Sequence, residues 1–552
     1  MTSELTSTGL VPDSTPVPTP GSKRVTRFPP EPNGFLHLGH LKAMMFDFDL
    51  DFDLNEVSAE TSESEHRTKT IKPECILRMD DTNPETERDE YVHSIVEDVK
   101  WLGYSFSKLT YTSDYFDQLY EFALELIRMG CAYVDLSTGD EIKNMRHSGT
   151  ESVYRSASPE DNMKLFTDMR RGKFAENEAV LRLKIDMQNN NHSLRDPIAY
   201  RVKYAPHYRT GDRWCIYPTY DYSHGLVDAI EGVTDSFCTM EFYVRREQYY
   251  WPVLKLKDKF NLTLATVLEF GRLNIEGVAL SKRKIVPLIG DGLLKGFDDP
   301  RLYTIRGLRR RGFTPEILKK IVSHAGMGRN PTTIAKSLIE FELRDRFDKE
   351  CVRAFAVTDP YKVEIIPSSR DLSEIRHMRP CVHPNHPSVK MLGDHTTMLG
   401  DTIYLERSDF REVDSPDYYR LAPGKTIRLR YADFVKYVDH NNDRIIVENV
   451  VPDKPKKIKG VVHWVSVDDS VPVIFETCDP LYKDDGVIDE TSRIHRSNGF
   501  VERFVIDTLV KTENKTNLVF QFERVGYYKF DRYEDERPVF IRVIDLADKY
   551  NK

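Results

Sequence analysis

The chain has 552 residues and a mass of 64.2 kDa, which exceeds what one hydrophobic core usually supports, so three or more domains are expected. Hydrophobic residues make up 40% and charged residues 30% of the chain, which is typical of globular proteins and argues against a disordered chain. The formal net charge of -9 excludes a generally basic surface. Any nucleic-acid surface must therefore be a local basic cluster.

The N-terminus and the cysteines indicate the cellular compartment. The first 24 residues are rich in Ser, Thr and Pro and lack the pattern of a signal peptide, which predicts a disordered tail over residues 1–24. No stretch approaches the roughly 18–20 apolar residues that cross a bilayer. The seven cysteines are scattered without CxxC pairs, as expected of reduced thiols. We therefore expect a cytoplasmic protein with no membrane partner.

The first ordered segment is a strand-loop-helix unit. VTRF reads as a short strand, PPEPNG as a turn-rich loop, and Leu36 to Leu50 as a helix. His37 and His40 lie three residues apart in its first turn, where free backbone N–H groups favour a phosphate. Histidines at this spacing also occur on ordinary helix surfaces and in metal sites. The polar stretch from about 51 to 73 reads as an insert. Its acidic residues could instead form a calcium loop, but the spacing of oxygen ligands and the central Gly of such a loop are absent.

The remaining chain changes character several times. Residues 25–130 and 213–290 alternate strand and helix patterns, and 131–212 is a mixed, polar module inserted between them. Helical spacing fills much of residues 291–355, whereas residues 356–552 are short β-rich runs separated by turn signals.

Several motifs together resemble one enzyme family. RFPPEPNGFLHLGH (27–40), LRMDDTNPETERDEYV (77–92), EFGRLNIEG (269–277) and ALSKRK (279–284) resemble the signatures of class I aminoacyl-tRNA synthetases, in their glutaminyl and glutamyl branch. The resemblance extends from Arg27 to QFERVGYYKFDR near the C-terminus. It implies a multidomain α/β plus β fold: a Rossmann-like catalytic domain split by an acceptor-stem module, a helical subdomain and two anticodon-binding β-barrels at the C-terminus.

The resemblance also implies an activity. A glutamine–tRNA ligase would activate L-glutamine with ATP and Mg²⁺ and transfer it to the 3′-terminal adenosine of tRNA(Gln), with activation requiring bound tRNA. The implied catalytic residues are His37, His40 and Lys282. The implied ATP-binding residues are Glu31, Pro32, Asn33, His37, Gly39, His40, Thr239, Arg272, Leu273, Leu280, Ser281 and Lys282.

The choice of glutamine depends on the segment from Trp214 to Phe242. Glutamate and glutamine are nearly isosteric, so charge and hydrogen-bond direction must separate them. Glutamyl relatives typically carry Arg where this chain has Cys238, which favours glutamine and leaves a glutamate–tRNA ligase and an inactive tRNA-binding paralogue as alternatives. By family match, the glutamine-binding residues are Arg27, Asp80, Tyr220, His224 and Cys238. The chain departs from bacterial relatives at Gly225, Asp235 and Val244.

Basic clusters in the C-terminal part supply the expected tRNA surface. Unpaired bases are recognised by stacking and by donors to their edges. Family match implies contacts from Arg344, Arg420, Arg428, Arg430, Gln521 and Arg524, with Asp417 and Tyr419 replacing readers of bacterial relatives. CVHPNHP suggests a zinc site of Cys381, His383 and His386, but no fourth ligand has suitable spacing, so no protein-bound metal is expected. The oligomeric state stays open, with a monomer as the default.

Overall fold

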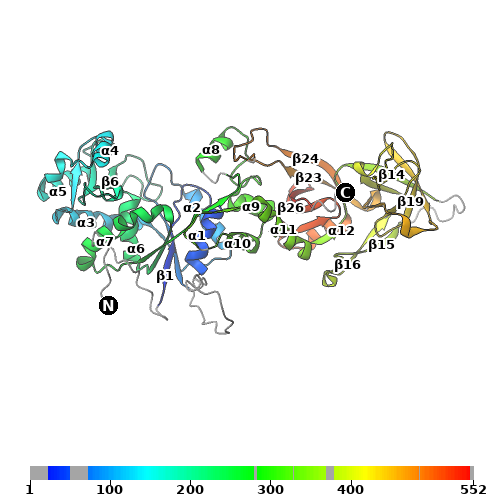
Figure 1. Cartoon of the computed structure of the whole chain (residues 1–552), viewed down its shortest axis with the longest axis horizontal. Helices are drawn as coiled ribbons and strands as arrows, with labels where there is room; N and C mark the ends of the chain where they lie inside the picture. Colours follow the sequence, from blue (N-terminus) through cyan, green and yellow to red (C-terminus); the bar gives the residue numbers. More distant parts are fainter. Residues whose placement is uncertain are drawn as a thin grey trace. The chain divides into compact units, whose positions relative to one another are not determined.

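The computed structural model describes residues 23–49, 73–278, 282–326, 328–367, 378–483 and 485–546. These form two compact units, Met1–Asn274 with Val322–Thr333, and Ile275–Ile321 with Ile334–Lys552 (Figure 1). Nearly all of the tail predicted over residues 1–24 and of the predicted polar insert falls outside the described residues. Within the described ranges, no helix has the length and apolar character needed to span a bilayer.

Parallel strands form the centre of the first unit. They are β1 (Val25–Phe28), β2 (Glu74–Met79) and β3 (Lys108–Tyr111) in one sheet, and β8 (Asp235–Thr239) and β9 (Thr266–Phe270) in another. The backbone N–H of Thr234 donates to the carbonyl of Val25 over 2.9 Å, which sets the start of β8 beside β1. The alternation of these strands with α1 (Leu38–Asp49) and α2 (Asp89–Trp101) gives the predicted Rossmann-like layering.

An antiparallel sheet follows along the chain. Its strands run in the order β4 (Ala132–Asp135), β5 (Val180–Leu183), β6 (Ile198–Val202) and β7 (Ile216–Pro218). The accompanying helices are α3 (Phe116–Arg128), α4 (Gly139–Ser148) and α5 (Pro159–Arg170). A fully buried ion pair joins Arg182 to Asp135 over 2.7 Å and ties β5 to β4. Each charge offsets part of the other's desolvation cost, so losing either partner would leave a buried charge unpaired.

Two helices carry the site residues from the middle of the chain. α6 (Tyr220–Glu231) and α7 (Arg246–Phe260) pack against each other. They approach each other closely at Gly225, where a Cβ would lie 2.5 Å from the carbonyl oxygen of Tyr249. The glycine that departs from bacterial relatives is therefore required by the spacing of these two helices.

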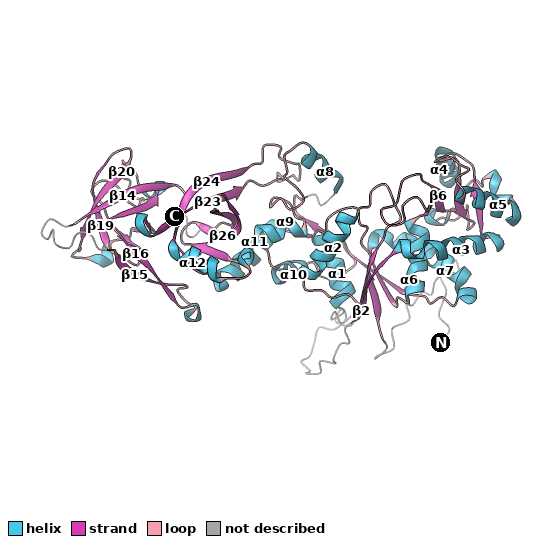
Figure 2. Cartoon of the chain, turned by 180° about the vertical axis from the view of Figure 1, so that it is seen from behind, coloured by secondary structure: helices cyan, strands magenta, loops and turns pink. Residues whose placement is uncertain are grey.

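The second unit begins with helices and continues as β-structure (Figure 2). Its first elements are α8 (Lys282–Gly290), α9 (Ile305–Arg311), α10 (Pro315–Ser323) and α11 (Lys336–Glu350), of which α10 extends two residues past the boundary between the units. Helices fill much of the predicted helical range 291–355. Within it, residues Thr332–Ile334 form strand β11 and Val352–Ala354 form strand β12, so the last helix of the range spans Lys336–Glu350.

The described β-rich part contains the two-stranded sheet of β15 (Arg379–Pro384) and β16 (Asp394–Leu399) and two seven-stranded sheets. One has the order β12 (Val352–Ala354), β25 (Val519–Phe522), β26 (Gly526–Glu534), β27 (Arg537–Ile544), β23 (Ser470–Cys478), β24 (Ile494–Glu502) and β13 (Ala356–Val357). The other has the order β21 (Val461–Val462), β18 (Thr426–Leu429), β19 (Phe434–His440), β20 (Arg444–Val450), β14 (Pro360–Ile366), β17 (Thr402–Glu406) and β22 (Val465–Ser466). These are the two predicted barrel-like domains.

Replacing Gly225 tests the close approach of α6 and α7. We expect Gly225→Ala to destabilise the protein by about 1–3 kcal/mol, because the added methyl group meets backbone that cannot rotate away. The matched control is Gly139→Ala at the start of α4, where an added Cβ meets nothing within 4 Å. The melting temperature of Gly225→Ala should lie clearly below that of Gly139→Ala. Equal melting temperatures would show that the two helices can accommodate a methyl group at Gly225.

Candidate active site

The HLGH turn presents two imidazoles at the N-terminus of α1. The rings of His37 and His40 lie with their centroids 3.9 Å apart. Burial lowers the pKa of His40 to about 4. Burial, together with His40 and Arg272 nearby, also lowers the pKa of His37 well below its ordinary value. Both rings are therefore neutral at pH 7.

Backbone hydrogen bonds fix the tautomer of both rings. Nδ1 of His37 accepts from the N–H of Gly39, and Nδ1 of His40 accepts from the N–H of His37, each over 3.1 Å. A neutral imidazole that accepts at Nδ1 carries its proton on Nε2. Both histidines thus offer an Nε2–H donor at a helix N-terminus, which is the arrangement that binds a phosphate.

Gly39 is required by the same turn. A Cβ at this position would lie 2.9 Å from Cε1 of His37 and 3.0 Å from its Nδ1. Any side chain would therefore displace the imidazole that Gly39 itself orients.

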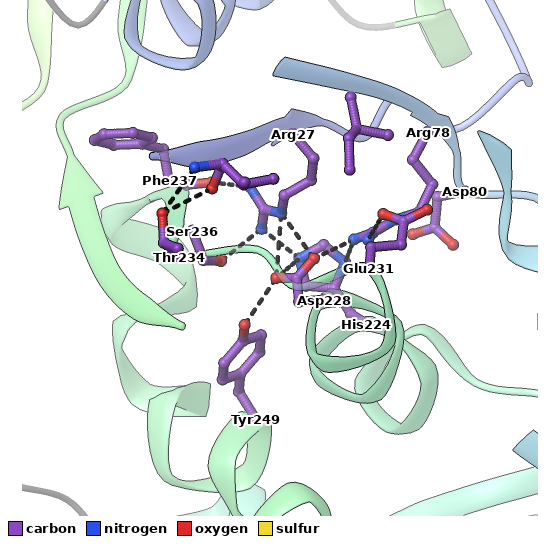
Figure 3. Close-up of polar contacts among 12 residues, drawn as sticks. Arg27, Arg78, Asp80, His224, Asp228, Glu231, Thr234, Ser236, Phe237 and Tyr249 are labelled. Atoms are coloured by element: carbon purple, nitrogen blue, oxygen red, sulfur yellow. Dashed lines mark hydrogen bonds and ion pairs between the residues drawn. The ribbon is translucent and has the colours of Figure 1, made fainter. Parts of the chain in front are cut away.

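A buried carboxylate organises the charges behind the site (Figure 3). Asp228 on α6 accepts from Nε of Arg27 over 3.0 Å, from Nη2 of Arg78 over 2.5 Å and from the hydroxyl of Tyr249 over 2.7 Å. Burial alone would raise the pKa of Asp228, but the two guanidinium groups hold it well below its usual range. Arg78 also pairs with Glu231 over 2.8 Å. Two arginines and two acids therefore cancel in the interior.

The N–H groups of the Arg27 guanidinium form hydrogen bonds within the protein. Its Nη1 donates to the carbonyl of Phe237 over 3.1 Å, and its Nη2 donates to Oγ of Ser236 over 2.6 Å and to Nε2 of His224 over 2.7 Å. Because His224 accepts there, and burial keeps its pKa well below the ordinary value, this ring is neutral. Arg27 lines the cavity, but its charge is already balanced by Asp228.

The predicted substrate residues converge on one cavity of about 540 Å³. Tyr220 stacks on His224 with ring centroids 4.6 Å apart. Burial raises the pKa of Tyr220, so its hydroxyl stays protonated, and it has no hydrogen-bond partner in the described part of the chain. The predicted residues that line this cavity are Arg27, Glu31, His40, Asp80, Tyr220, His224, Cys238 and Thr239.

Asp80 supplies the negative charge of this cavity. Burial raises the pKa of its carboxyl group to about 6, although Arg78 acts in the opposite direction. The hydroxyl of Thr112 donates to its Oδ1 over 3.2 Å. The group is therefore ionised at pH 7 and able to bind an ammonium group.

A narrow recess around Cys238 opens beside Tyr220. Burial raises the pKa of the Cys238 thiol to about 12, so it is uncharged. The two arginines of the recess are both paired, Arg245 with Asp221 over 2.8 Å and Arg246 with Glu269 over 3.7 Å. The recess thus presents a neutral surface with polar atoms at its rim.

The other predicted ATP-binding residues are only partly placed. Pro32 and Asn33 lie in the turn before α1, Arg272 pairs with Glu241 over 2.9 Å, and Leu273 is buried at the start of β10 (Leu273–Ile275). Leu280 and Ser281 lie outside the described residues. Lys282 begins α8, and its side chain also lies outside the described part.

Sequence reasoning missed Asp228, Tyr249 and Arg201. Asp228 and Tyr249 read as ordinary helix residues, because their partners are far away in sequence. Arg201 on β6 lines the cavity, and its buried Nε has no hydrogen-bond partner in the described ranges, so it can hold an anionic group. Its only signal in the sequence was a basic residue among the mostly apolar residues of IAYRV.

A second, larger cavity of about 970 Å³ lies in the same unit. Its lining includes Arg146, His192, Val244 and Arg245. The exposed side chain of Val244 faces solvent, while its carbonyl accepts from Asn191 over 2.7 Å. The residue that departs from bacterial relatives therefore borders a polar cavity.

The predicted tRNA-binding residues differ in how freely they can act. Arg420 and Arg524 both pair with the buried Asp409, and Arg430 pairs with Glu523. Arg428 is exposed on β18, and no described residue is a partner of its side chain. Gln521 is buried with an unpaired Oε1, and Arg344 donates to the carbonyl of Asp545 over 3.0 Å.

Family models match nearly the whole chain. The model of the catalytic domain of class I tRNA synthetases (E and Q) matches residues 23–56 and 64–348. Two models of the anti-codon binding domain of the same class match residues 351–452 and 461–531.

Three relatives specify the branch of the class. A probable glutamine–tRNA ligase of Dictyostelium discoideum is 42% identical over 97% of this chain and 67% of its own length. The glutamine–tRNA ligase of Lupinus luteus is 41% identical over 96% of this chain and 66% of its own length. That of Buchnera aphidicola is 38% identical over 95% of this chain and 94% of its own length. The chain spans about two thirds of the first two relatives and nearly all of the third. With its HLGH turn, neutral recess and anticodon-binding domains, the chain belongs to the class I tRNA synthetases of the E and Q type, among the glutamine–tRNA ligases.

Proposed function

We propose that the cavity between the HLGH turn and Cys238 activates L-glutamine with ATP, and that the chain then transfers glutamine to the 3′-terminal adenosine of tRNA(Gln). The observation that carries this proposal is the single cavity that joins His40, Asp80, Tyr220 and Cys238. It holds a phosphate-binding turn at one end and a neutral recess at the other.

The ATP end acts by electrostatic stabilisation. The glutamine carboxylate attacks the α-phosphorus in line, and pyrophosphate leaves. Nε2–H donors of His37 and His40 stabilise the charge that grows on the phosphate oxygens. Lys282 is assigned to the leaving phosphates by family match, and Mg²⁺, when bound with ATP, neutralises part of the same charge.

The amino-acid end selects by charge. Asp80 binds the substrate ammonium group, and the protonated hydroxyl of Tyr220 is free to bind the side-chain carbonyl. A glutamate carboxylate would enter a recess whose arginines are already paired with acids. Burying that charge without a partner costs far more than burying a neutral amide. The glutamate alternative is therefore not favoured.

Each of the two units is assigned its own contact with the tRNA. The polar cavity that Arg146 and Val244 line is assigned to the acceptor stem, and the exposed Arg428 with Gln521 to anticodon bases. The same proposal includes the domain boundaries predicted from the sequence and a monomeric state. It also includes a place in cytoplasmic protein synthesis and an activation step that requires bound tRNA.

Charging assays with each amino acid test the proposal. With ATP, Mg²⁺ and tRNA(Gln), we expect kcat/KM for glutamine to exceed that for glutamate by roughly 10⁴-fold or more, because the neutral recess leaves a carboxylate unpaired. Charging of glutamate at a comparable rate would establish the glutamate alternative. No pyrophosphate exchange with either amino acid in the presence of tRNA would establish an inactive paralogue.

The pH dependence tests the role of Asp80. Its carboxyl pKa is about 6, and only the carboxylate binds the ammonium group, so kcat/KM for glutamine should fall about tenfold per pH unit below pH 6. Thr112 donates to Asp80 and lowers that pKa. The Thr112→Val variant should therefore move the break to higher pH. A break that stays in place in this variant would assign the titration to another group.

A further inference from the structure

Three metal-ligating side chains meet inside the β-rich part of the chain. His383 lies on β15 (Arg379–Pro384), His395 on β16 (Asp394–Leu399), and Glu502 ends β24. One nitrogen or oxygen atom of each lies within 4.8 Å of the others, and their exposures are 1%, 8% and 0%. The sequence motif grouped His383 with Cys381 and His386, a set rejected as a zinc site, whereas the fold brings His383 to His395 and Glu502.

The hydrogen bonds of a neutral His395 leave its Nε2 without a proton, although this nitrogen faces a carboxylate oxygen. The side-chain amide of Asn385 donates to the carbonyl of Leu392 over 2.6 Å, so its Oδ1 is an acceptor, and it lies 2.6 Å from Nδ1 of His395. Nδ1 must therefore carry a proton. Nε2 faces Oε1 of Glu502 over 3.1 Å, which is favourable only if a proton or a metal ion lies between them.

His383 distinguishes these two possibilities. Its Nε2 is buried and has no hydrogen-bond partner in the described part of the chain. A proton shared by His395 and Glu502 would leave this nitrogen unsatisfied at a cost, whereas a metal ion at the cluster would use it.

The carboxylate also lacks a conventional partner. Glu502 accepts from the N–H of Phe355 over 2.7 Å and from the hydroxyl of Thr397. Among the described residues, its only contact at ion-pair distance is with His395, and no Lys or Arg pairs with it. Buried carboxylates are otherwise paired with a cation or bound to a metal.

We propose that His383, His395 and Glu502 bind a divalent metal ion of the Zn²⁺ type. Two imidazoles and one carboxylate are a zinc donor set, and water completes the tetrahedron. The hydrogen bonds from His395 to Asn385 and from Thr397 to Glu502 are the outer contacts that orient such ligands. The ion would tie the β15–β16 hairpin to the end of β24, where α12 (Arg503–Lys511) begins.

His386 is already occupied elsewhere. Its Nδ1 accepts from the N–H groups of Ser388 and Val389 over 3.1 and 2.9 Å, and its Nε2 lies 2.5 Å from the carbonyl of Asp348. Cys381 is buried among the apolar residues of the sheet core. Neither is free to act as a zinc ligand in this arrangement, which makes Cys381 a suitable control position.

Metal analysis of the full-length protein tests the proposal. We expect about one Zn²⁺ per chain after purification in chelator-free buffer, and a chelator-treated protein that takes up one Co²⁺ with the visible absorption of a tetrahedral site. That spectrum should lack the near-ultraviolet charge-transfer band of a thiolate ligand. No metal on purification and no uptake of Zn²⁺ or Co²⁺ would overturn the proposal and leave a His395–Glu502 ion pair.

Two substitutions locate the site. His383→Gln should lower the affinity for Co²⁺ at least about tenfold, whereas Cys381→Ser should bind it as the parent protein does. The chelator should lower the melting temperature of the parent protein and of Cys381→Ser, but not that of His383→Gln. If His383→Gln binds Co²⁺ as tightly as the parent, or if Cys381→Ser alone loses it, the proposed ligands are wrong. Should His383→Gln fail to fold, the spectrum of the parent protein still decides the question.

Discussion

The active-site cavity depends on one buried carboxylate, that of Asp228. It balances Arg27 and Arg78 at the carboxyl-terminal side of the parallel strands, and the hydroxyl of Tyr249 holds it from α7. Without this charge, Arg27 would lose its carboxylate partner and Arg78 would keep only Glu231, and a buried cation without a partner costs several kcal/mol. With it, the arginines become rigid hydrogen-bond donors that fix His224 and Ser236 and carry no excess charge toward the substrate.

The two ends of the cavity suit different parts of the substrates. At one end, neutral imidazoles of His37 and His40 add two donors to a helix N-terminus, which suits a phosphate whose charge increases during reaction. At the other end, Cys238 and paired arginines leave a recess for an uncharged side chain. Asp80 also lines the cavity, and burial raises the pKa of its carboxyl group to about 6, so its charge depends on pH just below neutrality. The phosphate end therefore offers hydrogen-bond donors to a growing negative charge, whereas the amino-acid end offers no unpaired charge to a side chain.

Motifs predicted the fold class and pointed to several of the residues that line the cavity, because His40, Asp80 and Cys238 each lie in a local pattern. They did not predict Asp228, whose partners lie about 150 and 201 residues away, since no local spacing records such a pairing. The strand at Thr332–Ile334 was missed for a related reason: its pairing outweighs helical periodicity. Likewise, His383 was grouped with its sequence neighbours, whereas folding brings it to His395 and Glu502.

The most direct test of this account is the selectivity of Asp228→Asn, compared with the parent enzyme in charging assays with glutamine and with glutamate. The substitution keeps the shape of the side chain and removes its charge, so Arg27 and Arg78 regain net positive charge beside the recess. We predict that the ratio of kcat/KM for glutamine to that for glutamate falls at least about tenfold, in a variant whose circular dichroism matches the parent. An unchanged ratio in a folded variant would contradict the claim that this carboxylate keeps the pocket neutral.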